Sequence, residues 1–529
     1  MKKRKLLCLV LSLCLVLGMA GCGKGENSAA PSGASAESGA SAAAPASAGA
    51  PFDLSMLLIL YNQAPDPDGE FWKDMTSTYN VKMSIDWVPE STYTDKLALT
   101  LATNAIPDVT QIANLSEPVV VKAMDAGQFL PLDDSLDFEK YPNFNSISSS
   151  AWLTSKYKGS SYVFPRSRGR YNDCTYIRGD LLEKYGLPKP TTLEELTDYF
   201  RAIKAEDGMI PVPVELGGST NALGALFRMA MDTFGPGHIL PVYTEDGKGI
   251  VYQCFTEAYA QTVEWLQGLY EEGLLASEFP LYNTERNQEV FLAGIGGMRG
   301  QNAWHRYRLE TELQKAVPGA WLETIFGLDG PGGSTVLYDK GFYGGYALNA
   351  SLKKQPERLE WILDFYNKTA DPDKYWYFKY GLEGSYYTVE DGFPKMTELG
   401  QKEVTNSFYG PYVLATDLYD KVNSPLADAA YNRETQERVK DVDVQAAKID
   451  GAPFCIFEII QSPAFAQYWS MHQKEFEAYV ADTVTGTHTM EEFRAYQQQY
   501  LDAPEMQQAF KEFKENFDEF GLGDWSPEE

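Results

Sequence analysis

Arg166, Arg168 and Arg170 occupy alternate positions in a chain that has 74 acidic and 45 basic residues, so this cluster of positive charge stands out. Two chemical roles suit it. In an acidic protein, guanidinium groups form ion pairs with neighbouring carboxylates and stabilise the fold. Guanidinium groups also hold an anionic group of a small molecule, such as a uronic acid, through paired hydrogen bonds. The sequence leaves both roles open.

A second set of polar and aromatic residues suits a ligand rich in hydroxyl groups. Amides and guanidinium groups hydrogen-bond hydroxyls, whereas aromatic rings cover apolar C–H faces. Because the chain contains 33 Tyr and 27 Phe, a given ring is more often part of a core, and Asn62 can equally form a turn. The candidates are Asn62, Trp72, Asn114, Tyr343, Tyr346, Trp376, Tyr386 and Tyr387.

Strands that alternate with helices are expected to position these residues. Residues 54–60 form an apolar run, and residues 81–87 alternate between apolar and polar side chains, so both predict strands. Helices are expected at residues 70–79 and 94–104, and a further strand at residues 109–112. This order predicts βαβ units in a mostly parallel sheet, whose strand ends converge at one edge.

The later part of the chain is expected to be largely helical. Thr192 with Glu195, and Thr489 with Glu492, have the spacing of a capping box at a helix start. Thr256 and Pro356 also mark helix starts, and residues 463–485 have an amphipathic pattern. The expected fold class is therefore α/β with a helical C-terminal portion.

The first residues have the pattern of an export signal. A basic head precedes a short apolar run in residues 1–21, and small residues lead directly to Cys22. Small residues before a cysteine resemble the bacterial lipobox, in which that cysteine is lipidated; Met19 stands where Leu is usual. The alternative is an ordinary cleaved signal. Residues 22–51 are rich in Ala, Ser, Gly and Pro and predict a flexible tether.

Composition argues against several other classes of protein. A net charge of −29 with no basic run outside the export signal disfavours nucleic acid as a partner. After export, Cys174, Cys254 and Cys455 remain besides Cys22, widely spaced and beside apolar neighbours, so we expect buried thiols without disulfides. Neither a zinc motif nor a nucleotide-binding motif occurs. We therefore expect no metal and no cofactor.

Four segments together resemble the extracellular solute-binding proteins of family 1, which serve sugar-type ABC importers, and in particular their lipoprotein branch. No segment is diagnostic alone, but their order combined with the lipobox is specific, and the resemblance covers nearly all of the mature chain. The segments are NDCTYIRGDLLEKYGLPKPTT at 172–192, EWLQGLYEEGLL at 264–275, FLAGIGGM at 291–298 and YGLEGSYYT at 380–388.

The resemblance implies two α/β lobes of the type II periplasmic-binding-protein fold with a ligand cleft between them. The first lobe would hold residues 52–165 and 341–400, and the second residues 166–340 with part of 401–529; the C-terminal helices would be shared. Phe164–Pro165 is a candidate hinge, since it ends an apolar strand and precedes a polar loop that would carry Arg166 and Arg168. The resemblance also implies ligand contacts in the loop after Met298, which adds Arg299, Asn302 and Trp304 to the candidates.

The loop after residue 203 departs from the family. Many relatives have an Asp/Asn-rich loop there that can hold calcium, but residues 204–211 offer too few oxygen ligands. The Asp66–Gly69 turn lacks the EF-hand spacing. We therefore expect no structural calcium at either place.

The expected function is capture of an oligosaccharide at the outer face of a bacterial membrane and its delivery to an ABC permease. The protein would be a monomer anchored by lipid on Cys22. Two alternatives remain. A binder of peptides or of another non-sugar solute would use similar Tyr and Asn side chains. A tethered glycoside-active enzyme would need two carboxylates at a set separation. The chain has so many acidic residues that such a pair cannot be identified from the sequence. No catalytic motif was found, so we expect a binding protein and no enzyme.

Overall fold

The computed structural model describes residues 50–168, 173–206, 208–213, 224–235, 241–330, 333–336, 341–415, 422–440, 442, 456–458 and 460–521. Residues 1–49 form a separate unit from residues 50–529, and only the second unit is described below. The predicted export signal, Cys22, Arg170 and Cys455 lie outside the described residues. Cys174 and Cys254 are both buried and neither is part of a disulfide, as predicted.

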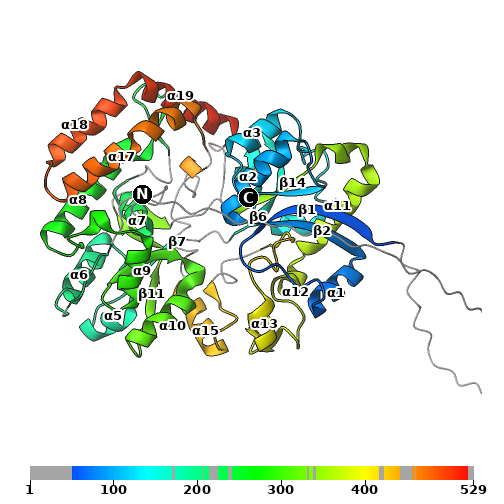
Figure 1. Ribbon diagram of the computed structural model, residues 1–529. Helices are drawn as coiled ribbons and strands as arrows, with labels where there is room; N and C mark the ends of the chain where they lie inside the picture. The colour runs from blue at the N-terminus through cyan, green and yellow to red at the C-terminus, as the bar shows by residue number, and fades with distance from the viewer. Residues whose placement is uncertain are drawn as a thin grey trace, which may run out of the picture. The chain divides into compact units, whose positions relative to one another are not determined.

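A five-stranded sheet in the order β2-β1-β3-β14-β6 forms one part of the molecule (Figure 1). Its strands are β1 (Phe52–Leu60), β2 (Val81–Pro89), β3 (Val109–Ile112), β6 (Val163–Ser167) and β14 (Phe342–Leu348). β1 is parallel to β2 and β3, but β14 is antiparallel to both β3 and β6. The prediction of a mostly parallel sheet is therefore correct only for the first three strands, because β14 and β6 enter the sheet from distant parts of the chain.

A second, three-stranded sheet has the order β10-β7-β11 and is antiparallel throughout. Its strands are β7 (Asp173–Arg178), β10 (Met298–Asn302) and β11 (Leu322–Ile325). Arg299 and Asn302 therefore lie in a strand, and the expectation of a loop directly after Met298 is wrong. The strand is followed directly by the short 3₁₀ helix η4 (Ala303–His305), which carries Trp304.

Helices surround both sheets, and the described chain also contains short hairpins. The helices are α1 (Glu70–Thr78), α2 (Glu90–Ala102), α3 (Pro118–Asp125), α4 (Ser149–Thr154), α5 (Gly179–Tyr185), α6 (Leu193–Ile203), α7 (Gly224–Phe234), α8 (Glu257–Glu271), α9 (Thr284–Leu292), α10 (Arg306–Ala316), α11 (Pro356–Thr369), α12 (Tyr375–Tyr380), α13 (Glu398–Glu403), α15 (Ala429–Val439), α17 (Pro463–Val484), α18 (Met490–Leu501) and α19 (Pro504–Glu519). The hairpins are β4 (Lys156–Tyr157) with β5 (Ser160–Ser161), β8 (Val242–Tyr243) with β9 (Ile250–Val251), β12 (Gly327–Gly330) with β13 (Gly333–Val336), and β15 (Tyr387–Glu390) with β16 (Phe393–Met396). The remaining 3₁₀ helices are η1 (Pro142–Ser146), η2 (Gln253–Phe255), η3 (Phe279–Leu281), η5 (Ala350–Lys354), η6 (Pro372–Lys374) and η7 (Ile456–Glu458).

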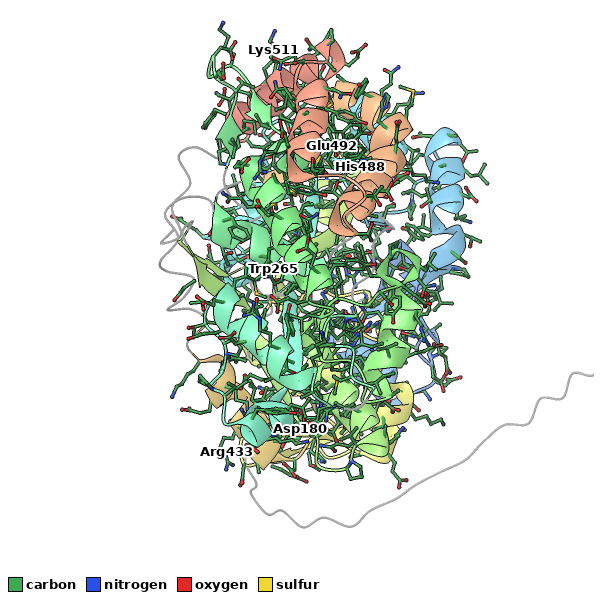
Figure 2. All side chains as sticks on the ribbon, turned by 90° about the vertical axis from the view of Figure 1, so that its left-hand side faces the viewer. Asp180, Trp265, Arg433, His488, Glu492 and Lys511 are labelled. Carbon is green, nitrogen blue, oxygen red and sulfur yellow. The ribbon has the colours of Figure 1, made fainter. Side chains whose placement is uncertain are left out.

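The predicted helix starts are confirmed at the level of side chains. Thr192 and Glu195 form a complete capping box at the start of α6, and Thr489 and Glu492 form one at the start of α18. Figure 2 shows Glu492 beside His488 at that start. The Glu492 carboxylate accepts the Thr489 N–H at 2.8 Å, and this bond, together with the one from the Thr489 hydroxyl, lowers the pKa of Glu492. Each box satisfies backbone N–H groups that a helix start otherwise leaves unpaired.

The buried apolar side chains form separate clusters that follow the two sheets. One cluster joins residues 54–164 with residues 342–414 around the five-stranded sheet. The largest joins residues 177–328 with residues 456–517. It includes the C-terminal helices, because α17 packs against α8 and α19 (Figure 1). Trp265, labelled in Figure 2, is partly buried against this cluster and donates its indole N–H to Thr197 at 3.1 Å.

A break in the β14–β6 pairing lies at Tyr343, which is a residue of β14. The register shifts between Phe342 and Gly345, and Gly344 there has φ +62°. A Cβ atom on Gly344 would lie 2.0 Å from the carbonyl oxygen of Ile112, so only glycine fits this approach. The irregularity leaves the Tyr343 ring 41% exposed although both flanking segments are buried.

Gly344→Ala is expected to lower the free energy of unfolding by about 3 kcal/mol, because left-handed strain and overpacking each cost roughly 1–3 kcal/mol. The unfolding midpoint in urea measures this. Gly392→Ala is the matched control, since Gly392 has φ +87° but no atom within 4 Å of an added Cβ. It should cost only about 1 kcal/mol from strain. Equal losses in the two variants would mean that the contact with Ile112 is relieved at little cost.

Candidate functional site

Arg166 lies inside β6, so the prediction that it follows the end of that strand is wrong. Its side chain is only 6% exposed, and Nη1 donates to the Tyr61 hydroxyl at 3.2 Å. The guanidinium carbon is 5.7 Å from the centre of the Tyr61 ring and 5.9 Å from that of Tyr346. Within the part of the chain that the structure describes, Arg166 forms no ion pair with a carboxylate.

The two rings beside Arg166 are held in place by buried contacts. Tyr346 is fully buried, stacks on Tyr366 at a centroid distance of 5.6 Å and donates its hydroxyl to the carbonyl of Gly410. Gln111 accepts the backbone N–H of Ile59 at 3.0 Å and donates to the Tyr61 hydroxyl at 3.3 Å. The position of Arg166 is therefore preorganised by the five-stranded sheet, since Tyr61 directly follows β1, and Gln111 and Tyr346 lie in β3 and β14.

Arg168 lies directly after β6 between two exposed aromatic rings. Its backbone N–H donates to the carbonyl of Gly341 at 2.8 Å. Its guanidinium carbon is 6.0 Å from the centre of the Trp304 ring and 5.5 Å from that of Tyr343. Trp304 is 39% exposed and follows the second sheet, whereas Tyr343 belongs to the first. The predicted residues Arg166, Arg168, Trp304, Tyr343 and Tyr346 are thus brought together from both sheets.

Lys379 and Tyr409 adjoin this group and were not among the sequence candidates. Lys379, on α12, places Nζ 3.5 Å from the centre of the Tyr409 ring. Burial alone would raise the pKa of the Tyr409 hydroxyl, but Lys379, followed by Arg168 and Arg166, lowers it below its usual value. The local potential is therefore positive. Arg166, Arg168 and Lys379 are called the cationic cluster below.

Arg299, Asn302 and His305 belong to the same short segment as Trp304, and the centre of the His305 ring lies 5.2 Å from that of the Trp304 ring. Arg299 is 3% exposed and donates to the Asn287 side chain at 3.1 Å, so it is anchored inside the second sheet. The backbone carbonyl of Asn302 accepts a hydrogen bond from Tyr176 at 2.9 Å. Burial, with Arg308 and Arg299 nearby, lowers the pKa of His305 to about 4. The imidazole is therefore neutral at neutral pH and adds no charge beside Trp304.

A cavity of about 680 Å³ lies beside α12, within the volume range typical of small-molecule sites. Trp376 and Tyr387 line it with their ring centres 6.0 Å apart, and Lys374 and Glu383 contribute charges. The structure thus brings together these two sequence candidates. α12 carries both Trp376, at this cavity, and Lys379, in the cationic cluster.

Trp72 and Tyr386 border a much smaller cavity of about 70 Å³. Tyr386 is 1% exposed and donates its hydroxyl to Glu403 at 2.8 Å, and burial, followed by this contact, raises its pKa to about 12. These contacts belong to the packing between α1 and the segment around α13. The structure does not bring Trp72 or Tyr386 to the cationic cluster through any contact between described residues.

Asn62 and Asn114 are exposed residues of the turns that follow β1 and β3. The Asn114 side chain accepts the backbone N–H of Ser116 at 2.9 Å, which is the geometry of an Asx turn. The backbone N–H of Asn62 donates to the Ser407 hydroxyl at 3.4 Å. Asn114 therefore has the contacts of a turn residue. The sequence had left open the same role for Asn62.

The described residues contain no group of three or more His, Cys, Asp or Glu side chains placed to hold a metal ion. They also contain no helix that is long and apolar enough to cross a membrane.

Comparison with known proteins gives consistent matches. The family model for bacterial extracellular solute-binding proteins matches residues 63–386. A polygalacturonan/rhamnogalacturonan-binding protein of Bacillus subtilis is 26% identical over 393 residues, which cover 73% of this chain and 74% of the relative.

Two solved structures have the same fold. An HMO-binding, ABC-transporter-associated solute-binding protein of Bifidobacterium longum infantis has a TM-score of 0.64 at 18% identity, covering 89% of this chain and 99% of the other. An alginate-binding protein has a TM-score of 0.56 at 18% identity, covering 88% and 98%. The fold is therefore the two-lobed α/β type of solute-binding proteins, as the sequence predicted.

Proposed function

Because the chain belongs to the family of bacterial extracellular solute-binding proteins, we propose that it captures an oligosaccharide outside the cell and delivers it to the permease of an ABC transporter. The observation that carries this proposal is the pair of exposed rings, Trp304 and Tyr343, on either side of Arg168. Exposed rings beside a multivalent hydrogen-bond donor suit the apolar faces and hydroxyls of a sugar. Two relatives, a polygalacturonan/rhamnogalacturonan-binding protein and a fructooligosaccharide ABC transporter substrate-binding protein, support the same ligand class.

We place the ligand between two lobes that carry the two sheets. The first lobe is residues 52–165 with 341–400, and the extent of its buried cluster supports including the chain to Leu414. The second is residues 166–340 with the C-terminal helices, whose apolar faces join the other cluster. A ligand that contacts both lobes binds the closed form more tightly and shifts the population towards it. Transport energy then comes from a separate ATPase.

The proposal includes the membrane anchor and excludes catalysis. Lipid on Cys22 would hold the monomeric protein at the outer face of the bacterial membrane, with residues 22–51 as tether. Relatives in this family are binding proteins, and no feature of the described residues indicates a reaction. Mass spectrometry of the N-terminal peptide from membrane fractions tests the anchor separately from sugar binding.

Trp304→Ala is expected to weaken oligosaccharide binding by at least about tenfold, because a ring that stacks on the ligand contributes roughly 1.4 kcal/mol or more. Binding is measured by calorimetry after a thermal-shift screen of residues 51–529. Ligand at 100 times its dissociation constant adds about 2.7 kcal/mol of stability, which gives a readable shift. Tyr243→Ala is the control, since Tyr243 is also exposed, at 47%, but lies on the β8–β9 hairpin.

The same screen separates the alternatives. Intact sugar recovered from the complex is the expected result. A shift with short peptides and with no oligosaccharide would assign the protein to the non-sugar binders. Shortened sugar products would show that it is an enzyme, and unchanged affinity in Trp304→Ala would remove this ring from the site.

A further inference from the structure

We propose that the cationic cluster of Arg166, Arg168 and Lys379 binds the carboxylate of an acidic sugar unit, so that the preferred ligand is an oligosaccharide containing uronic acid. This inference rests on the proposed function and specifies its ligand class. Two of these cations, Arg166 and Lys379, have no carboxylate partner among the described residues, and aromatic rings surround them.

Arg166 is the strongest part of the argument. Burying a guanidinium group without an opposite charge is costly, and proteins normally pair it. This chain does so elsewhere. Arg178 and Arg306 are each 3% exposed, and they form ion pairs with Asp180 at 2.5 Å and with Glu310 at 3.3 Å. Arg166 is almost as buried, yet among the described residues its polar partner is the neutral hydroxyl of Tyr61.

A shortage of carboxylates does not explain this difference. Acidic residues outnumber basic ones by 74 to 45, and most surface lysines and arginines of the described chain have an acidic neighbour. Lys379 nevertheless contacts the face of Tyr409 and forms no ion pair within the described ranges. The lowered pKa of Tyr409 agrees with an excess of positive charge at this place. A bound anion would supply the missing charge.

The surrounding groups select a sugar carboxylate over a small inorganic anion. Arg168 lies between the exposed rings of Trp304 and Tyr343, and such rings provide an apolar surface of the size of a pyranose face. A guanidinium group binds a planar carboxylate through two parallel N–H···O bonds. A uronic acid unit has both features, a carboxylate and an apolar ring face. With a neutral sugar, neither the ligand nor any described residue would place a carboxylate at the buried Arg166.

The test compares each acid with its own neutral form. Calorimetry measures trigalacturonate and trimannuronate, the corresponding methyl esters, neutral trisaccharides and triglutamate. We expect at least one oligouronate to bind ten or more times more tightly than its methyl ester, because the ester keeps the sugar ring but has lost the negative charge. Lys379→Gln should reduce that ratio at least threefold while the ester affinity changes less than twofold. Lys368→Gln, an exposed lysine of α11 paired with Asp364, is the control and should leave the ratio unchanged.

The other outcomes each have one meaning. Esters or neutral trisaccharides that bind as tightly as the acids overturn the inference and leave the proposed function intact. Triglutamate binding as tightly as the oligouronates shows a carboxylate site that is not selective for sugar, which also overturns it. A protein that binds no oligosaccharide of either kind contradicts the proposed function itself, and the inference with it.

Discussion

Arg166→Met should stabilise the ligand-free protein while it removes most of the affinity for an acidic oligosaccharide. The substitution keeps an unbranched side chain in β6 but removes a buried charge that has no carboxylate partner among the described residues. Replacing a buried charge by an apolar side chain leaves the free energy of unfolding unchanged or raises it by roughly 1–4 kcal/mol. The loss of the cation–π contacts with Tyr61 and Tyr346 reduces this gain by about 1 kcal/mol. Loss of paired hydrogen bonds to a carboxylate should weaken binding about a hundredfold.

Urea unfolding without ligand and calorimetry with an oligouronate measure the two effects separately. Arg166→Lys is the control, because it keeps the charge but cannot make two parallel hydrogen bonds. It should leave the stability near that of the wild type and weaken binding by an intermediate factor. A strongly destabilised Arg166→Met variant that still binds normally would assign Arg166 to the fold and not to the ligand.

Arg306→Met is expected to have the opposite sign in stability, lowering the free energy of unfolding by roughly 3–5 kcal/mol. Arg306 is as buried as Arg166, but it pairs with Glu310 at 3.3 Å and donates to the Leu322 carbonyl at 3.0 Å. It also lies 5.0 Å from the Tyr431 ring and so joins α15 to the second sheet. Its removal leaves the Glu310 charge buried without its partner.

The pH dependence gives this prediction a second check. Burial already raises the pKa of Glu310 above its usual value, and Arg306 counteracts the rise. Without Arg306 that pKa must rise further, so the folded variant binds a proton at a higher pH than the unfolded chain does. Stability lost at neutral pH should then be partly regained as the pH falls towards 5. The double variant Arg306→Met/Glu310→Gln should regain the lost stability at every pH, because it has no buried carboxylate at this position. An Arg306→Met variant as stable as the wild type at pH 7 would contradict the pairing of Arg306 with Glu310.

Local signals in the sequence predicted the helices and the early strands well, because caps and periodicity are properties of neighbouring residues. Thr192 with Glu195 and Thr489 with Glu492 are confirmed for this reason. The position of Arg166 was misjudged because Pro165 was taken to end a strand. β6 is the edge strand of its sheet, however, and an edge strand tolerates a residue without a backbone N–H.

Tertiary pairing decided what the sequence could not show. Residues 299–302 are polar and were expected to form a loop, but hydrogen bonding to β7 makes them a strand. Lys379 and Tyr409 lie beside Arg166 and Arg168 only because α12 and the segment after α13 pack on the first sheet, and no local pattern indicates that contact. By contrast, Trp304 and Tyr343 could be selected by residue type and polar neighbours. Their role as ligand contacts stays a prediction.

The strand order also determines when the protein can finish folding. β3 ends at Ile112, whereas its neighbour β14 begins at Phe342, so the whole second sheet is synthesised between the two halves of one ladder. Until β14 arrives, the edge of β3 presents unpaired backbone groups, which invite association with other chains. Closing so long a loop is also slow compared with forming local contacts. The newly made chain can therefore aggregate through the edge of β3 until β14 pairs with it, whereas the complete five-stranded sheet has no free edge at β3.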